Sequence, residues 1–113
     1  MIKRVLKAIK DLTKGKPLAL RSSHWDEVRD SFLANNNSCA ACGSKNNLQV
    51  HHIKPFHLFP EEELNLNNLI TLCEGKNNKC HLNIGHHGNW KNNNPDVVNE
   101  AKKFLDLINN KNI

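Results

Sequence analysis

The sequence contains no Tyr, only two Trp and four Phe, and no long apolar run in its 113 residues. A membrane-spanning helix needs about 20 mostly apolar residues, so none is predicted. Charges recur every few positions over residues 1–10, which argues against the apolar region of a secretory signal peptide. We therefore expect a cytoplasmic protein of one small domain, whose limited core would gain stability from a bound metal or from disulfides.

Positive charge exceeds negative charge, because 16 Lys and Arg stand against 11 Asp and Glu and give a formal net charge of +5. Such an excess favours a polyanionic partner, either a nucleic acid or an anionic membrane. A basic surface that is merely solvated explains the same excess. Charge alone therefore leaves these alternatives open.

Three segments have the apolar periodicity of helices. Residues 1–20 are predicted to form a basic amphipathic helix, which can dock on the core, on a partner subunit or on a membrane surface. Residues 21–35 predict a second helix, with Ser23 and Asp26 spaced as a capping box. Residues 95–109 predict the C-terminal helix, which begins with a proline at its first position.

Short strands separate these helices. Apolar and β-branched residues predict one strand over 48–53 and another over 69–72, and a helix can begin at His81. This order of elements predicts an α+β fold. We expect the basic N-terminal helix to precede one domain over 21–113, with its core in residues 39–90.

All four cysteines lie in that core, and they form two pairs 31 residues apart. A Cys-x-x-Cys turn offers two thiolates to one metal, and a second pair completes the four-sulfur tetrahedron of a structural zinc. A redox-active pair and two disulfides in an exported protein are the alternatives. The predicted zinc ligands are Cys39, Cys42, Cys73 and Cys80.

A second cluster combines histidines with an asparagine. Its members are His51, His52, Asn68, His81 and His86. Side chains of this kind can bind a divalent cation and transfer a proton. Neighbouring residues on a strand point to opposite faces, so His51 and His52 are predicted to play different parts. Each histidine taken singly is equally explained as an ordinary surface residue.

Together these motifs resemble the HNH endonuclease family, and more closely its small phage and bacterial members with a zinc knuckle. The resemblance covers about residues 21–100. It rests on Cys39-x-x-Cys42, Val50-His51-His52-Ile53, Pro55, Asn68-Leu69-Ile70-x-Leu72-Cys73, Cys80-His81, and the later Gly85-His86, Gly88-Asn89-Trp90-Lys91 and Asn94-Pro95. It implies a ββα-metal (His-Me finger) core with a Cys₄ zinc knuckle, flanked by N- and C-terminal helices.

The resemblance also implies roles. His52 would be the general base that activates water, and His51 and His81 would be ligands of a catalytic Mg²⁺, Mn²⁺, Ni²⁺ or Zn²⁺. Asn68 would either orient the strand and loop around the base or enter the metal's coordination shell. The cysteines would hold the structural zinc.

One position departs from the family pattern. Many members carry a further histidine four residues after the third letter of the motif, where this chain has Gly85, followed by His86 and His87. In a regular helix of about 100° per residue, His86 would point roughly 140° away from His81. We expect His86 to contact the metal or the scissile phosphate, and expect His57 and His87 to be surface or DNA-facing residues.

The sequence therefore predicts a metal-dependent DNA endonuclease that contacts mainly backbone phosphates and nicks or cuts the duplex. The alternative is a non-catalytic zinc module that binds DNA or protein. Residues 1–20 can supply a homodimer contact or bind another phage protein. If the gene is phage-borne, the expected location is the cytoplasm of the bacterial host.

Overall fold

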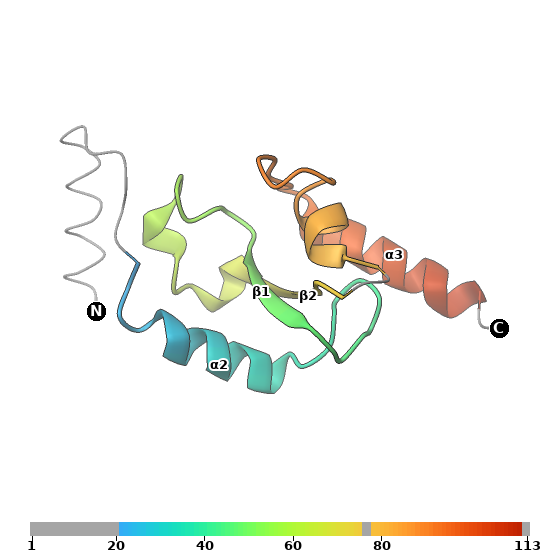
Figure 1. Ribbon diagram of the computed structural model, residues 1–113, viewed down its shortest axis with the longest axis horizontal. Helices are drawn as coiled ribbons and strands as arrows, with labels where there is room; N and C mark the ends of the chain where they lie inside the picture. The colour runs from blue at the N-terminus through green and yellow to red at the C-terminus, as the bar shows by residue number, and fades with distance from the viewer. Residues whose placement is uncertain (1–20, 76–77, 112–113) are drawn as a thin grey trace.

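The structure is a computed structural model that describes residues 21–75 and 78–111. The helix predicted over residues 1–20 lies outside the described residues. The described part contains helix α2 (Trp25–Asn35), strands β1 (Leu48–His52) and β2 (Leu69–Cys73), and helix α3 (Val97–Lys111). Helix α2 lies beside β1, whereas α3 packs near a short helical turn over His81–Gly85 (Figure 1). The predicted α+β class is confirmed.

The two strands pair antiparallel, and their register positions the chemistry-bearing residues. Leu48 lies opposite Cys73 at one end, and His52 lies opposite Leu69 at the other. Every residue of β2 is buried, while β1 is mostly half-buried, with Gln49 exposed and His51 buried. Cysteines therefore gather at one end of the hairpin, and the paired histidines lie toward the other.

The core is small and includes three of the cysteines. Its other members are apolar side chains from the turn before β1, from β2 and from α3: Ala41, Ile70, Leu72, Val97 and Ala101. Leu72 and Val97 are fully buried. Because so few apolar side chains fill this core, a bound metal among the cysteines would contribute a large share of its stability.

Helix α2 begins later than expected, and the predicted capping box is wrong. The helix starts at Trp25 after His24, and no side chain caps it. The hydroxyl of Ser22, not of Ser23, accepts the backbone N–H of His24 at 3.0 Å. The residues before the helix are held instead by a contact with the loop over Glu63, which fixes where the helix starts.

Helix α3 also begins two residues after the predicted start, at Val97. The buried Asn94 lies three residues before this start. Its side-chain oxygen accepts the N–H of Asp96 at 3.0 Å, and its amide donates to the carbonyl of Ile84 at 2.8 Å. This asparagine therefore ties the start of α3 to the His81–Gly85 turn.

Candidate active site and metal centres

The four cysteines come together from three segments. Cys39 and Cys42 lie on the turn before β1, Cys73 ends β2, and Cys80 precedes the His81–Gly85 turn. All four are free thiols, their sulfur atoms lie within 4.8 Å of one another, and Cys42 Sγ is 3.6 Å from Cys73 Sγ. Gly43, at φ +78°, allows the tight turn. The cluster can therefore bind one metal ion, and zinc suits four sulfur donors.

The electrostatics of the thiols fit a cation. Burial opposes ionisation of Cys42, but hydrogen bonds, first from the backbone of Ser44 and then from neighbouring side chains, lower its pKa to about 7. Burial raises the pKa of Cys73 and Cys80, and for Cys80 the nearby Cys39 raises it further. Cys42 thus ionises readily, whereas ionisation of Cys73 and Cys80 is opposed. A bound positive ion would stabilise the additional thiolates.

Three histidines form a second cluster. His51 comes from β1, and His81 and His86 stand at either end of the short turn that follows Cys80. Their ring centroids are 4.9–5.0 Å apart in all three pairs, and one ring nitrogen of each lies within 4.8 Å of the others. Three imidazoles at this spacing can hold a divalent cation.

The turn over His81–Gly85 explains how His86 reaches this cluster. It is a π-helical turn, not an α-helical one. A π turn closes over i→i+5 hydrogen bonds, so residues five apart approach the same face. Gly85 is also required by space, because a Cβ there would lie 3.3 Å from the His51 ring and 3.3 Å from the His81 ring.

Hydrogen bonds fix which nitrogen of each ring faces the cluster. His81 Nδ1 lies 2.7 Å from a Glu74 carboxylate oxygen, and His86 Nδ1 donates to the carbonyl of Asn92 at 2.8 Å. Nε2 of His81 therefore carries a lone pair toward His51 Nδ1, 3.1 Å away. In one tautomer His51 Nδ1–H donates to this lone pair, and in the other tautomer the two nitrogens can both bind one cation.

Burial keeps the His51 and His81 rings neutral, which is the form that binds metals. Burial and the neighbouring histidines lower the pKa of His51 to about 3. The pKa of His81 is also lowered by burial, although the Glu74 carboxylate opposes the shift. Within the described residues, Nε2 of His51 has no hydrogen-bond partner and is buried.

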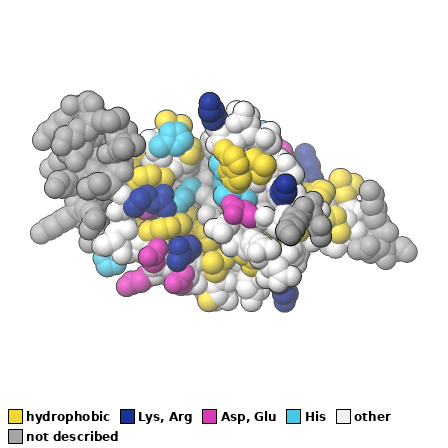
Figure 2. Space-filling view, viewed as in Figure 1, with side chains coloured by type: hydrophobic (Ala, Val, Ile, Leu, Met, Phe, Trp, Pro, Cys, Tyr) yellow, Lys and Arg dark blue, Asp and Glu magenta, His cyan; other side chains and the backbone are white. Residues whose placement is uncertain are grey.

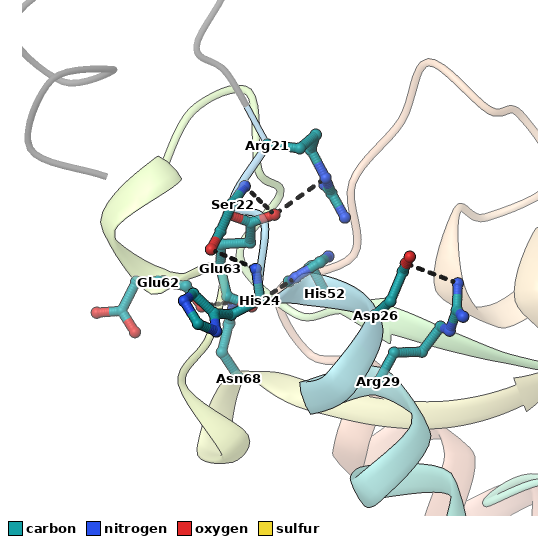
Figure 3. Close-up of polar contacts among 9 residues, drawn as sticks. All are labelled: Arg21, Ser22, His24, Asp26, Arg29, His52, Glu62, Glu63 and Asn68. Carbon is teal, nitrogen blue, oxygen red and sulfur yellow. Dashed lines mark hydrogen bonds and ion pairs between the residues drawn. The ribbon is translucent and has the colours of Figure 1, made fainter. Parts of the chain in front are cut away.

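His52 faces away from this cluster. Its Nε2 lies 2.9 Å from the carbonyl oxygen of Glu63 (Figure 3). The centroid of its ring is 4.5 Å from that of Trp25. A carbonyl only accepts, so Nε2 carries the proton and Nδ1 keeps a lone pair. Burial lowers the pKa of His52, and the charge of Arg21 lowers it further, against the effect of the Glu63 carbonyl. The adjacent histidines thus have different surroundings, as strand alternation predicts.

Asn68 is buried and acts on the backbone. Its side-chain oxygen accepts the N–H of Lys54 at 2.7 Å, and its amide donates to the carbonyls of Lys54 at 3.1 Å and Glu62 at 3.2 Å. Both ends of the amide are therefore used to join the segment after β1 to the loop before β2. Of the two roles suggested for Asn68, these contacts favour the one in which it orients the strand and loop around the base.

The comparisons with known proteins agree with this arrangement. Residues 39–87 match the family model described as HNH endonuclease, and that segment contains both clusters, His52 and Asn68. This segment is similar to the HNH endonuclease family. No curated protein and no solved structure gives a significant match. An HNH domain indicates nuclease chemistry in general, and the resemblance seen in the motifs is confirmed.

A cleft of about 350 Å³ opens beside the histidines of the segment that matches the HNH family. Figure 2 shows histidine side chains in a hollow near the middle of the viewed face, with hydrophobic side chains beside them. Both His51 and His52 border the cleft, so the two differently placed histidines can act on one bound molecule. Its other lining residues include Phe56, His57, Leu58, His81, His86, Trp90 and Lys91.

Three residues that lie against the site were not predicted to belong to it. Glu63 ends the acidic run over residues 61–63, Glu74 follows Cys73, and Trp25 begins α2. Only Glu74 carried a signal, since it directly follows Cys73. Within the described residues, no helix is both long and apolar enough to cross a bilayer.

Proposed function

We propose that this protein is a metal-dependent DNA endonuclease that hydrolyses phosphodiester bonds with His52 as general base. The observation that carries the proposal is that two adjacent histidines of β1 have different contacts. His51 faces two further histidines, His52 faces a carbonyl, and both border the same cleft. A non-catalytic zinc module would need neither the three-histidine cluster nor the different contacts of His51 and His52.

His52 has the properties of a base that removes a proton from water. Its Nε2–H is engaged by the Glu63 carbonyl, which leaves Nδ1 as the proton acceptor. Its lowered pKa keeps the ring neutral near pH 7, where a base must accept protons. Asn68 holds the loop that carries the Glu63 carbonyl, and so contributes to the orientation of the base.

His51, His81 and His86 would hold the catalytic cation, for which Mg²⁺, Mn²⁺, Ni²⁺ and Zn²⁺ are candidates. A bound divalent cation supplies charge stabilisation to the phosphate and to the departing oxygen. Glu74 fixes the His81 ring through Nδ1, as carboxylates commonly do for metal-binding histidines. Cys39, Cys42, Cys73 and Cys80 would hold a structural zinc in a ββα-metal fold that spans residues 21–113.

Basic residues around the cleft are suited to backbone phosphates. Lys91 lines the cleft, and Lys54 is exposed just after β1. Contacts of this kind bind DNA without reading its sequence, and they weaken as salt is added. We therefore expect binding with little sequence preference.

The test is a plasmid cleavage assay with several divalent cations, comparing the wild-type protein with His52→Ala. Removal of a general base lowers the rate by about 10² or more. The protein should cut or nick DNA only when a divalent cation is added, and His52→Ala should lose activity while still binding DNA.

His87→Ala is the matched control, because His87 is exposed, pairs with Glu100 and lies outside the cleft. It should cleave at the wild-type rate. Equal rates for wild type and His52→Ala, at equal metal content and folding, would exclude the base. Salt-dependent DNA binding with no cleavage under any cation would instead favour the non-catalytic module.

A further inference from the structure

Glu63 is a buried carboxylate that the proposed chemistry does not use. Its side chain is 1% exposed, although glutamate is rarely buried without partners. Both carboxylate oxygens lie within reach of the backbone N–H of Ser22, at 3.0 and 3.3 Å. Arg21 Nε completes the set at 3.0 Å (Figure 3). One loop residue thus ties down the chain just before α2.

The same residue contacts the candidate base through its main chain. The Glu63 carbonyl accepts Nε2–H of His52, and the preceding carbonyl, of Glu62, accepts the amide of Asn68. His52 of β1 and Asn68, which directly precedes β2, therefore bind two successive carbonyls of the loop. The Glu63 side chain is held from the opposite direction, by residues that precede the segment matching the HNH family.

Arg21 is itself held in place. Its guanidinium lies 4.5 Å from the Phe56 ring and 4.9 Å from the Trp25 ring, and Trp25 in turn packs on His52. Such stacking suits the planar guanidinium and limits its movement. Among the described residues, Arg21 is the cation that pairs with Glu63. A buried carboxylate that loses its cationic partner is strongly destabilised, so Arg21 and Glu63 depend on each other.

We propose that Glu63 is a positioning residue for His52, and that Arg21 acts as its counter-charge. The side chain of Glu63 fixes the loop, and its carbonyl then fixes the tautomer and orientation of the His52 ring. Catalysis depends on this pair because a misplaced or wrongly protonated ring leaves no lone pair on Nδ1 toward the cleft. This catalytic consequence rests on the proposed function, whereas the effect on the tautomer does not.

The test compares Arg21→Ala with the double variant Arg21→Ala/Glu63→Gln. Arg21→Ala leaves a buried carboxylate without a cation, so the loop and His52 should shift. A misplacement on the order of 1 Å can cost about 10²-fold, and we expect kcat to fall by about 10- to 100-fold with KM little changed. The double variant removes the uncompensated charge, keeps an acceptor for Ser22, and should recover most of the lost rate.

A second readout does not need activity. Nitrogen-15 NMR of the full-length protein should show His52 protonated at Nε2 in the wild type, a mixture of tautomers in Arg21→Ala, and the Nε2 form again in the double variant. Arg29→Ala removes the same charge from the surface of α2, where Arg29 pairs with Asp26 and Asp30, and should change neither readout.

The two readouts separate the possible failures. If Arg21 instead contacts DNA, the double variant will stay as slow as Arg21→Ala and KM will rise in both, which would overturn the proposal. An unchanged His52 tautomer in all variants would overturn it as well. A protein that shows the expected tautomers but cleaves no DNA would leave Glu63 as the positioning residue and refute the nuclease function.

Discussion

At the residue scale, the histidine cluster has least room at Gly85. A Cβ at this position would lie 3.1 Å from a Leu72 methyl group and 3.3 Å from the rings of His51 and His81. Those neighbours belong to a strand and a turn that are fixed by other contacts, so they can yield only by moving the rings.

We predict that Gly85→Ala weakens divalent-cation binding and destabilises the protein by about 1–3 kcal/mol, the usual cost of overpacking. Cation titration by calorimetry and thermal unfolding measure the two effects. Gly75→Ala is the matched control, because a Cβ there meets only the Asn47 side chain, at 3.6 Å. Unchanged cation affinity in Gly85→Ala would show that the rings are not held as closely as their contacts indicate.

At the scale of secondary-structure elements, the cysteine cluster joins parts that otherwise share few contacts. It connects the turn before β1, the end of β2 and the turn that begins at His81. His81 directly follows Cys80, so loss of the metal would also release one member of the histidine cluster.

We predict that a strong zinc chelator unfolds the protein, because structural zinc supplies on the order of 10 kcal/mol in small domains. Circular dichroism against temperature, alongside zinc content, measures the effect. Added zinc should restore the fold, whereas added Mg²⁺ should not, since thiolates are poor ligands for Mg²⁺. If the zinc-free protein melts at the same temperature, the cysteines do not hold a structural metal.

At the scale of the whole molecule, the buried histidines make stability depend on pH. The pKa of His51 is lowered from 6.5 to about 3 in the folded protein, and the pKa values of His52 and His81 are lowered too. Between pH 6.5 and 3 the unfolded chain binds a proton at His51 that the folded chain does not. Stability is therefore fully present above pH 6.5 and is lost as the pH falls.

We predict that the melting temperature falls steadily from pH 7 to pH 5. The free energy of unfolding should fall by a few kcal/mol, as an order of magnitude, between pH 6.5 and pH 3. His51→Asn removes the titrating group and should show a shallower decline, which separates this effect from acid release of zinc by the cysteines. Parallel pH profiles for the two proteins would mean that His51 does not titrate in this way.

Local patterns in the sequence were enough to predict the two cysteine pairs as metal ligands and to separate His51 from His52. A Cys-x-x-Cys turn and strand alternation depend on local geometry, whereas folding brings the two cysteine pairs together. The resemblance to the HNH family was also readable, since its motif is carried by residue types. Helix ends were predicted less well, because the backbone N–H of Ser22 binds Glu63 and the side chain of Asn94 binds the carbonyl of Ile84, and sequence spacing does not express these contacts.

The completion of the site, in contrast, depends on tertiary packing. A regular helix turns His86 away from His81, and the π turn that reverses this depends on packing of Gly85 against two rings from different elements. Glu63 is the last of three successive acids in the sequence, yet it is buried because Arg21, 42 residues earlier, supplies its charge partner. Contacts between distant segments set these positions, and no local pattern in the sequence records them.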